Sequence, residues 1–136
     1  MVGDPSPALD SASELAQGDI FVKTSWSGSV GVVSVWGVVD ALTAPQLTAA
    51  VQAAVDASPA ALVVDLSEVE FLASAGMSVL VATQQLLGTS IPLAVVADGP
   101  VTRRPMKLLG LDSIVEMHRT LQDALADIAQ DGESTG

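Results

Sequence analysis

A chain of 136 residues, of which 49% are hydrophobic, is long enough for one domain with a core of its own and too short for two. Sixteen acidic residues face five basic ones, and the net charge of −11 opposes binding to nucleic-acid phosphates or to anionic lipid. The absence of cysteine excludes disulfides and thiolate metal sites, and no apolar run approaches the roughly 20 residues that cross a bilayer. We therefore expect a cytoplasmic, monomeric protein that acts on a protein partner.

The first segment, residues 1–18, is rich in proline, serine, alanine and aspartate and has no sustained hydrophobic period, so we expect a flexible arm. Residues 20–26 and 30–36 have the composition of strands, and a serine-glycine turn separates them. This pattern predicts a hairpin whose first strand lies at a sheet edge and whose second strand is central. Trp26 and Trp36 are expected to pack rather than to bind a cofactor.

An amphipathic helix is predicted after this hairpin. Thr43 and Gln46 have the spacing of a capping box, and Pro45 falls in the first turn, where its missing N–H costs little. The helix ends near Ser58, because the proline that follows disfavours the helical conformation of this residue. Apolar residues recur with the helical period at Leu47, Ala50, Val51, Ala54 and Val55.

Residues 61–66 form a continuous apolar run that predicts a buried third strand. Asp65 and Ser67 are turn formers, so we expect the strand to end there. Phe71 and Leu72 are then expected to return to the core. A second helix should run from Ser74 to about Leu87, where Gly88 supplies a left-handed stop.

The last third of the chain repeats the alternation. Residues 91–97 predict a fourth strand and residues 114–118 a short fifth strand. Residues 102–109 predict a helix that Gly110 ends. Residues 131–136 are expected to form a disordered tail. Before this tail, a closing helix is predicted from the spacing of Leu121, Ala124, Leu125 and Ile128.

Strands that alternate with helices predict an α/β fold. We expect a single domain, residues 19–130, with a mixed and mostly parallel sheet of about five strands and about four helices. Partners of such sheets meet the loops beyond the carboxyl ends of the strands. Asp40 and the segment 67–74 are expected at that edge.

Ser74 is the candidate site that stands out at this edge. Its neighbours Ala73, Ala75 and Gly76 are small and leave the start of the helix almost bare. A serine at this place can cap the helix through its hydroxyl group. It can also be reached and modified by another protein, and the two roles do not exclude each other.

The motif Asp-Leu-Ser-x-Val-x-Phe-Leu-x-Ser-x-Gly, over residues 65–76, resembles the central motif of STAS domains. It is similar in particular to the single-domain anti-sigma factor antagonists of bacteria, and the resemblance runs over residues 18–129. The family commonly has Asp-Ser-Ser-Gly or Asp-Ser-Thr-Gly at residues 73–76. This chain keeps the serine and the glycine there but has Ala73 and Ala75 in place of the aspartate and the second hydroxyl residue.

The resemblance implies a phosphorylation switch. In the family, the serine aligned with Ser74 is phosphorylated by an anti-sigma factor that is itself a serine kinase. The unmodified protein binds the anti-sigma factor and frees the sigma factor, and a separate serine phosphatase resets the switch. The protein then has no chemistry and no cofactor of its own. The expected partner-binding residues are Asp40, Thr43, Ala73, Ser74, Ala75, Gly76 and Met77.

Asp40 and Thr43 also have simpler explanations. Gly37 and Asp40 match a family pattern whose aspartate lies near the phosphorylated serine, but an aspartate at a strand end also bonds the N–H groups of its own turn. Thr43 aligns with a second phosphorylation site of some relatives, but a capping role explains it adequately.

One competing hypothesis is a phosphoaspartyl receiver domain with Asp65 as the acceptor. Such a domain needs a pair of acidic residues at the end of its first strand and a lysine late in the sheet. This chain has Thr24 and Ser25 at the first place, and no lysine follows Lys107. A second competitor is an adaptor of the same fold that binds its partner without phosphorylation, in which Ala73 and Ala75 mark a loss of kinase recognition.

Three of the five basic residues lie close together, at Arg103, Arg104 and Lys107. They form either a solvated helix face or a positive patch that docks an acidic partner surface. His118, the single histidine, has no candidate partner ligands for a metal site or a general base.

Overall fold

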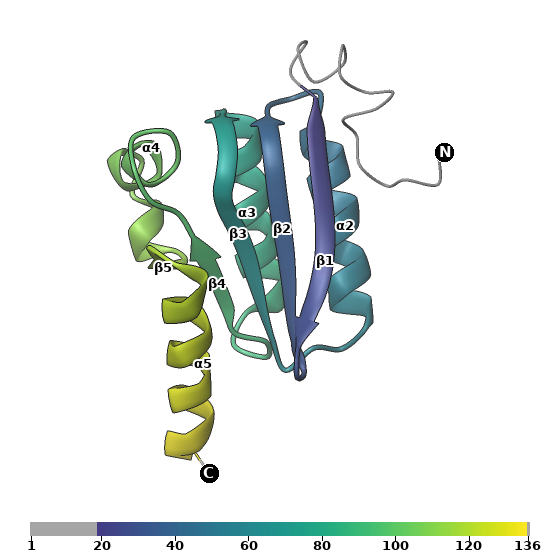
Figure 1. Cartoon of the computed structure of the whole chain (residues 1–136), viewed down its shortest axis with the longest axis vertical. Coiled ribbons are helices and arrows are strands. Elements are labelled where there is room, and N and C mark those ends of the chain that lie inside the picture. Colours follow the sequence, from purple (N-terminus) through teal and green to yellow (C-terminus); the bar gives the residue numbers. More distant parts are fainter. Residues whose placement is uncertain (1–18, 136) are drawn as a thin grey trace.

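A five-stranded sheet runs through the molecule in the order β1-β2-β3-β4-β5 (Figure 1). The computed structural model describes residues 19–135, with side chains up to residue 130, and the predicted arm of residues 1–18 lies outside this range. The first two strands are antiparallel and the others parallel, which confirms the predicted mixed sheet. The strands are β1 (Ile20–Ser27), β2 (Val30–Val39), β3 (Ala61–Leu72), β4 (Leu93–Val96) and β5 (Glu116–His118).

Helices cover both faces of this sheet, but unequally. In Figure 1, α2 and α3 lie behind β1, β2 and β3, whereas α5 lies beside β4 and β5. None of the helices in residues 19–135 is long and apolar enough to span a membrane. The sequence predicts that the domain ends at residue 130, and this boundary stays a prediction. The backbone of the last helix continues past this residue. The helices are α2 (Ala44–Asp56), α3 (Ser74–Leu87), α4 (Arg103–Leu108) and α5 (Leu121–Thr135), with a 3₁₀ turn, η1 (Leu111–Ser113).

Two hydrophobic clusters hold the layers together. Because strand side chains alternate between faces, Leu62 and Val64 of β3 point into the cluster that α2 and α3 cover. Val63 points to the other face, where it packs with Ala124 of α5. Burial on both faces explains why the first residues of β3 are continuously apolar, and each fully buried aliphatic side chain contributes about 1.5–3 kcal/mol.

The third strand does not end at Asp65 and Ser67, as the sequence predicts, but continues to Leu72. Its pairing with β2 shifts between Ser34 and Trp36, where β3 holds one more residue than β2. At this bulge the Asp65 carboxylate accepts hydrogen bonds from the backbone N–H of Ser67, at 3.0 Å, and from the Ser67 hydroxyl. The two turn formers are therefore satisfied inside a bulged strand, and they do not terminate it.

Phe71 is 55% exposed and not part of the core, contrary to the sequence prediction. A second register shift between β2 and β3 lies at Gly37 and Val38 and precedes the pair Val38–Phe71. Leu72 points into the cluster under α2 and α3, so its neighbour Phe71 points to the opposite face. Among the described residues, no helix covers that face over β1 and β2 (Figure 1).

The tryptophans of the hairpin pack against neighbouring residues, as predicted. The rings of Trp36 and Phe21 lie 5.4 Å apart between centroids, with a tilt of 49°. The ring of Trp26 lies over Gly31, although the side chain remains 47% exposed. Gly28 takes a φ of +61° in the turn between the two strands, which favours glycine there.

Candidate partner-binding site

Ser74 is the first residue of α3 and is exposed, directly beyond the carboxyl end of β3. The N-cap of this helix is Ala73, with the extended dihedrals φ −88° and ψ 171°, and no side chain caps the helix. The predicted capping role of Ser74 is therefore wrong. Because β3 stays extended as far as Leu72, the one non-helical residue before α3 is Ala73, and the serine falls one position too late to cap.

A backbone hydrogen bond joins the Ser74 region to the end of the neighbouring strand. The N–H of Ala73 donates to the carbonyl oxygen of Val39 at 2.8 Å. Asp40 follows Val39 directly, so the loop after β2 and the start of α3 lie next to each other at the carboxyl edge of the sheet. The structure thus brings Asp40 and Ser74 to the same edge, as expected for strands of a parallel pair.

Gly76 and Met77 support this edge from beneath, since both are buried. A Cβ atom at Gly76 would lie 2.5 Å from Cγ1 of Val39 and 2.8 Å from Cδ1 of Leu72. Only glycine lets the first turn of α3 approach the strand ends this closely. The small residues of the motif therefore have two roles. Ala73 and Ala75 place no bulky side chains around Ser74, and Gly76 lets the first turn of α3 pack against the core.

The loop after β2 is locked by the side chains of Asp40 and Thr43. Oδ1 of Asp40 accepts hydrogen bonds from the N–H groups of Leu42 and Thr43, at 3.0 and 3.1 Å. The Thr43 hydroxyl donates to the carbonyl oxygen of Val38 at 2.7 Å and accepts from the N–H of Asp40 at 2.9 Å. Asp40 thus bonds its own turn, which was the simpler of its two explanations.

Thr43 holds the N-cap position of α2, but its hydroxyl makes no capping bond, so the predicted capping box with Gln46 is wrong. The hydroxyl does not cap the helix because it already bonds the carbonyl oxygen of Val38 and the N–H of Asp40, at the end of β2. Thr43 is also 5% exposed, and a kinase could not reach it in this conformation.

Two exposed apolar residues of this edge, Leu42 and Phe71, were missed by sequence reasoning. Leu42 is 88% exposed at the tip of the locked loop. Leu42 belongs neither to the alternating pattern of the preceding strand nor to the apolar stripe of the following helix, and this could have indicated its exposure. Phe71 carried no such signal, because its orientation depends on the register shifts of β3. Large exposed apolar side chains at the sheet edge that also carries Ser74 offer a partner contact area.

A groove of about 290 Å³ runs along α3 from Ser74. One side is lined by α3 residues at helical spacing, among them Ser74, Met77 and Val81. The other side is formed by Leu109 and Leu111, which follow α4. Ser74 therefore lies at the end of an apolar groove and not inside an enclosed pocket.

The remaining candidates lie elsewhere or are engaged. Asp65 lies within β3 and bonds Ser67, so it does not have the strand-end position that a phosphoaspartyl acceptor requires, and the receiver hypothesis is wrong on this point. His118 lies in β5 with its Nε2 3.7 Å from Oδ2 of Asp127. Within the described part of the chain, no group of three or more potential metal ligands gathers.

The sequence and the fold are similar to those of known proteins. A family model described as Mlab, STAS domain matches residues 22–117. The anti-sigma-F factor antagonist RsfB of Mycobacterium tuberculosis is 43% identical over 113 residues, which are 83% of this chain and 93% of RsfB. The crystal structure of an anti-sigma factor antagonist from Mycobacterium paratuberculosis shares 47% sequence identity and has a TM-score of 0.78, covering 81% of this chain and 94% of that chain.

A more distant structure supports the fold alone. An anti-sigma-factor antagonist (STAS) domain protein from Planctomyces limnophilus shares 17% identity at a TM-score of 0.66, over 82% of this chain and 98% of that one. With the family model spanning residues 22–117 and RsfB aligned over almost its whole length, the assignment rests on the entire sheet and not on the serine motif alone. The chain therefore belongs to the STAS-domain family, in the group of the anti-sigma factor antagonists.

Proposed function

We propose that the unmodified chain binds an anti-sigma factor and so releases the sigma factor that this partner holds. Phosphorylation of Ser74 by the partner, acting as a serine kinase, ends the binding. The observation that carries the proposal is the exposure of Ser74 at the first turn of α3, beside the apolar groove. The exposed Leu42 and Phe71 at the same edge supply further apolar contact area for the partner.

The effect of phosphorylation follows from charge and from the helix start. A phosphoserine carries about −1.5 to −2 charges and three acceptor oxygens at pH 7. The first N–H groups of a helix lack intrahelical partners and favour an anion, so the free protein accommodates the group at Ser74 without unfolding. A partner surface that fits closely over Ala73, Ser74 and Ala75 would have to desolvate this charge. Because this desolvation is costly, the partner dissociates.

The partner supplies the chemistry of this switch. Nucleotide and magnesium belong to the kinase, and a separate serine phosphatase removes the phosphate. The STAS domain contributes a substrate hydroxyl and a docking surface.

The release of a sigma factor tests this proposal directly. We expect the unmodified protein to displace the sigma factor from a preformed complex with the cognate anti-sigma factor, measured by size exclusion or by restored transcription in vitro. Protein phosphorylated at Ser74 should leave the complex intact. If the unmodified protein binds no anti-sigma factor and frees no sigma factor, the proposed function is wrong.

A second candidate function is that of an adaptor that is never phosphorylated. The specific observation in its favour is that Ala73 holds the N-cap position of α3, where the related motif has an aspartate. An aspartate there would cap the helix and add a negative charge next to the serine. Mass spectrometry after incubation with the anti-sigma factor and ATP separates the two functions, because an adaptor keeps its unmodified mass.

Leu42 should act as an apolar anchor for the partner. Its side chain is 88% exposed and the loop is held by Asp40 and Thr43, so Leu42→Ala removes contact area without disturbing the fold. We expect the dissociation constant to rise about tenfold, within the range of an interface anchor, and the melting temperature to stay unchanged. Leu86→Ala on α3, which is 59% exposed, is the matched control. Equal affinities of the two variants would exclude Leu42 from the interface.

A further inference from the structure

Four of the five basic residues of the chain line one pocket. Arg103, Arg104 and Lys107 of α4 and Arg119 after β5 surround a volume of about 480 Å³, together with Asp98. The fifth basic residue, Lys23, lies on β1. Four cations against one carboxylate leave a local excess of three positive charges in a protein whose net charge is −11. We call the four basic residues and Asp98 the basic pocket.

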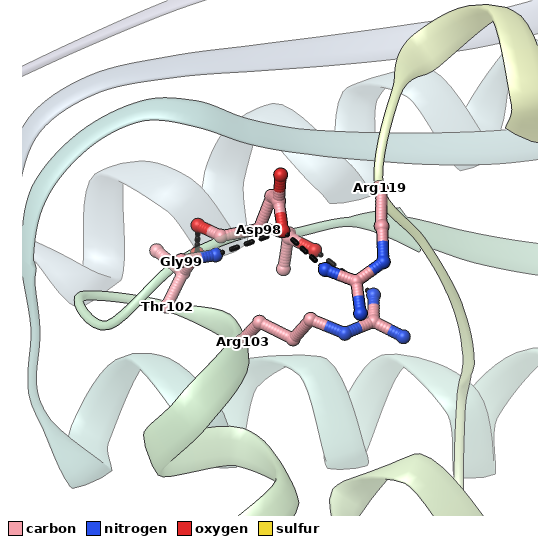
Figure 2. A network of polar contacts seen from close by, with 6 residues as sticks. Asp98, Gly99, Thr102, Arg103 and Arg119 are labelled. Carbon is pink, nitrogen blue, oxygen red and sulfur yellow. Dashed lines mark hydrogen bonds and ion pairs between the residues drawn. The ribbon is translucent and has the colours of Figure 1, made fainter.

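Two arginines of the basic pocket make polar contacts with the residues that follow β4. Figure 2 shows Arg119 and Arg103 extending past Asp98 at the end of β4. Nη1 of Arg119 lies 2.6 Å from Oδ1 of Asp98, which also accepts the N–H of Gly99 at 3.0 Å. Nη1 of Arg103 donates to the carbonyl oxygen of Ala97 at 3.1 Å. Nε of Arg103 is buried and has no acceptor among the residues that the structure describes.

The other two cations are available to a partner. Arg104 and Lys107 are exposed, and neither forms an ion pair with any side chain between residues 19 and 130. Exposed cations on a helix are often only solvated. Here, however, they lie in the same pocket as Arg103 and Arg119, in a protein whose net charge of −11 otherwise repels acidic groups.

The basic pocket and the Ser74 groove are lined by adjacent residues at the C-terminal end of α4. Leu108 lines the basic pocket, and Leu109 lines the groove that begins at Ser74. Both leucines are exposed, at 75% and 61%. A protein that covers Ser74 and the groove therefore reaches the basic pocket by crossing these two residues.

We propose that the basic pocket is a second docking point, which takes an acidic segment of the protein that binds at Ser74. The identity of that protein rests on the proposed function. Complementary charges at an interface mainly fix its register and speed association. In a strongly acidic protein, a site that gathers four of the five basic residues fixes which way an acidic segment lies. Leu108 and Leu109 provide contacts for apolar residues of the same segment.

A peptide probe tests the pocket without the partner. We expect an acetylated peptide of alternating glutamate and leucine to shift the amide resonances of Gly99, Arg104, Lys107 and Leu108 in ¹⁵N-labelled protein, with shifts that fade at high salt. Lys107→Glu should weaken this binding about tenfold, whereas Lys23→Glu, which makes the same charge change on β1, should not. The absence of these shifts, or equal effects of both variants, would overturn the proposal. So would inorganic phosphate at equal concentration producing the same shifts, because a small-anion site would then explain them.

The partner assay separates this inference from the proposed function. With the cognate anti-sigma factor, we expect Lys107→Glu to slow association about tenfold at low salt and Lys23→Glu to leave it unchanged. If the wild type binds and Ser74→Asp abolishes binding, but Lys107→Glu behaves as Lys23→Glu, the proposed function stands and the basic pocket has no part in docking. If the wild type itself does not bind, the proposed function fails, and the identity of the docked protein fails with it.

Discussion

Replacing Ser74 with aspartate should weaken binding of the anti-sigma factor on the order of 100-fold, which corresponds to about 3 kcal/mol. The substituted carboxylate would lie on the exposed first turn of α3, where a partner that covers the turn must desolvate it. The helix start stabilises this charge in the free protein, so the penalty falls on the complex and not on the fold. Isothermal calorimetry with the purified partner measures the difference.

Ser74→Asn is the matched control, because asparagine has nearly the shape of aspartate without its charge. We expect Ser74→Asn to lose much less affinity than Ser74→Asp and Ser74→Ala to bind as the wild type does. If Ser74→Asp and Ser74→Asn weaken binding equally, the size of the side chain and not its charge determines the loss of affinity. If neither weakens it, Ser74 lies outside the interface.

Replacing Gly76 with alanine should lower the free energy of unfolding by about 2 kcal/mol. Two effects oppose each other at this position. Alanine has the better helix propensity and would stabilise an open site by about 1 kcal/mol. Its Cβ, however, would lie 2.5 Å from Cγ1 of Val39 and 2.8 Å from Cδ1 of Leu72, so atoms of a packed core must move. The steric cost exceeds the propensity gain, and chemical denaturation measures the net loss.

A double-mutant cycle shows whether this contact is the cause. Val39→Ala removes the nearest atoms, so Gly76→Ala should cost less in that background than in the wild type, with a coupling of about 1 kcal/mol. Additive losses would mean that Gly76 is required for a reason other than its approach to Val39. Ala75→Ser on the same turn, at a half-buried position, should change stability little.

The order of elements follows from the sequence because each depends on local periodicity. The stripe from Leu47 to Val55 and the continuous apolar run at the start of β3 report which faces are buried, and Gly88 and Gly110 mark where helices end. The α/β fold and the mostly parallel sheet were predictable on this basis. The position of Ser74 at the start of a helix beyond a strand was predictable for the same reason.

The details of the candidate site were not predictable, because they depend on pairing between distant segments. Two register shifts against β2 carry β3 past Asp65 and Ser67 and turn Phe71 outward, and no local pattern encodes a bulge. The longer strand moves the N-cap to Ala73 and leaves Ser74 exposed without a capping role. Likewise, Arg119 joins the cations of α4 only through the position of β5 beside β4.

The most direct measurement compares one protein preparation before and after phosphorylation at Ser74. Peptide mass spectrometry confirms the site, and circular dichroism confirms that the fold and the melting temperature are unchanged. We predict that the unmodified protein binds the cognate anti-sigma factor and that the phosphorylated protein binds it at least about 100-fold more weakly. Equal affinity of the two forms, with the phosphate on Ser74 and the fold intact, would contradict the account.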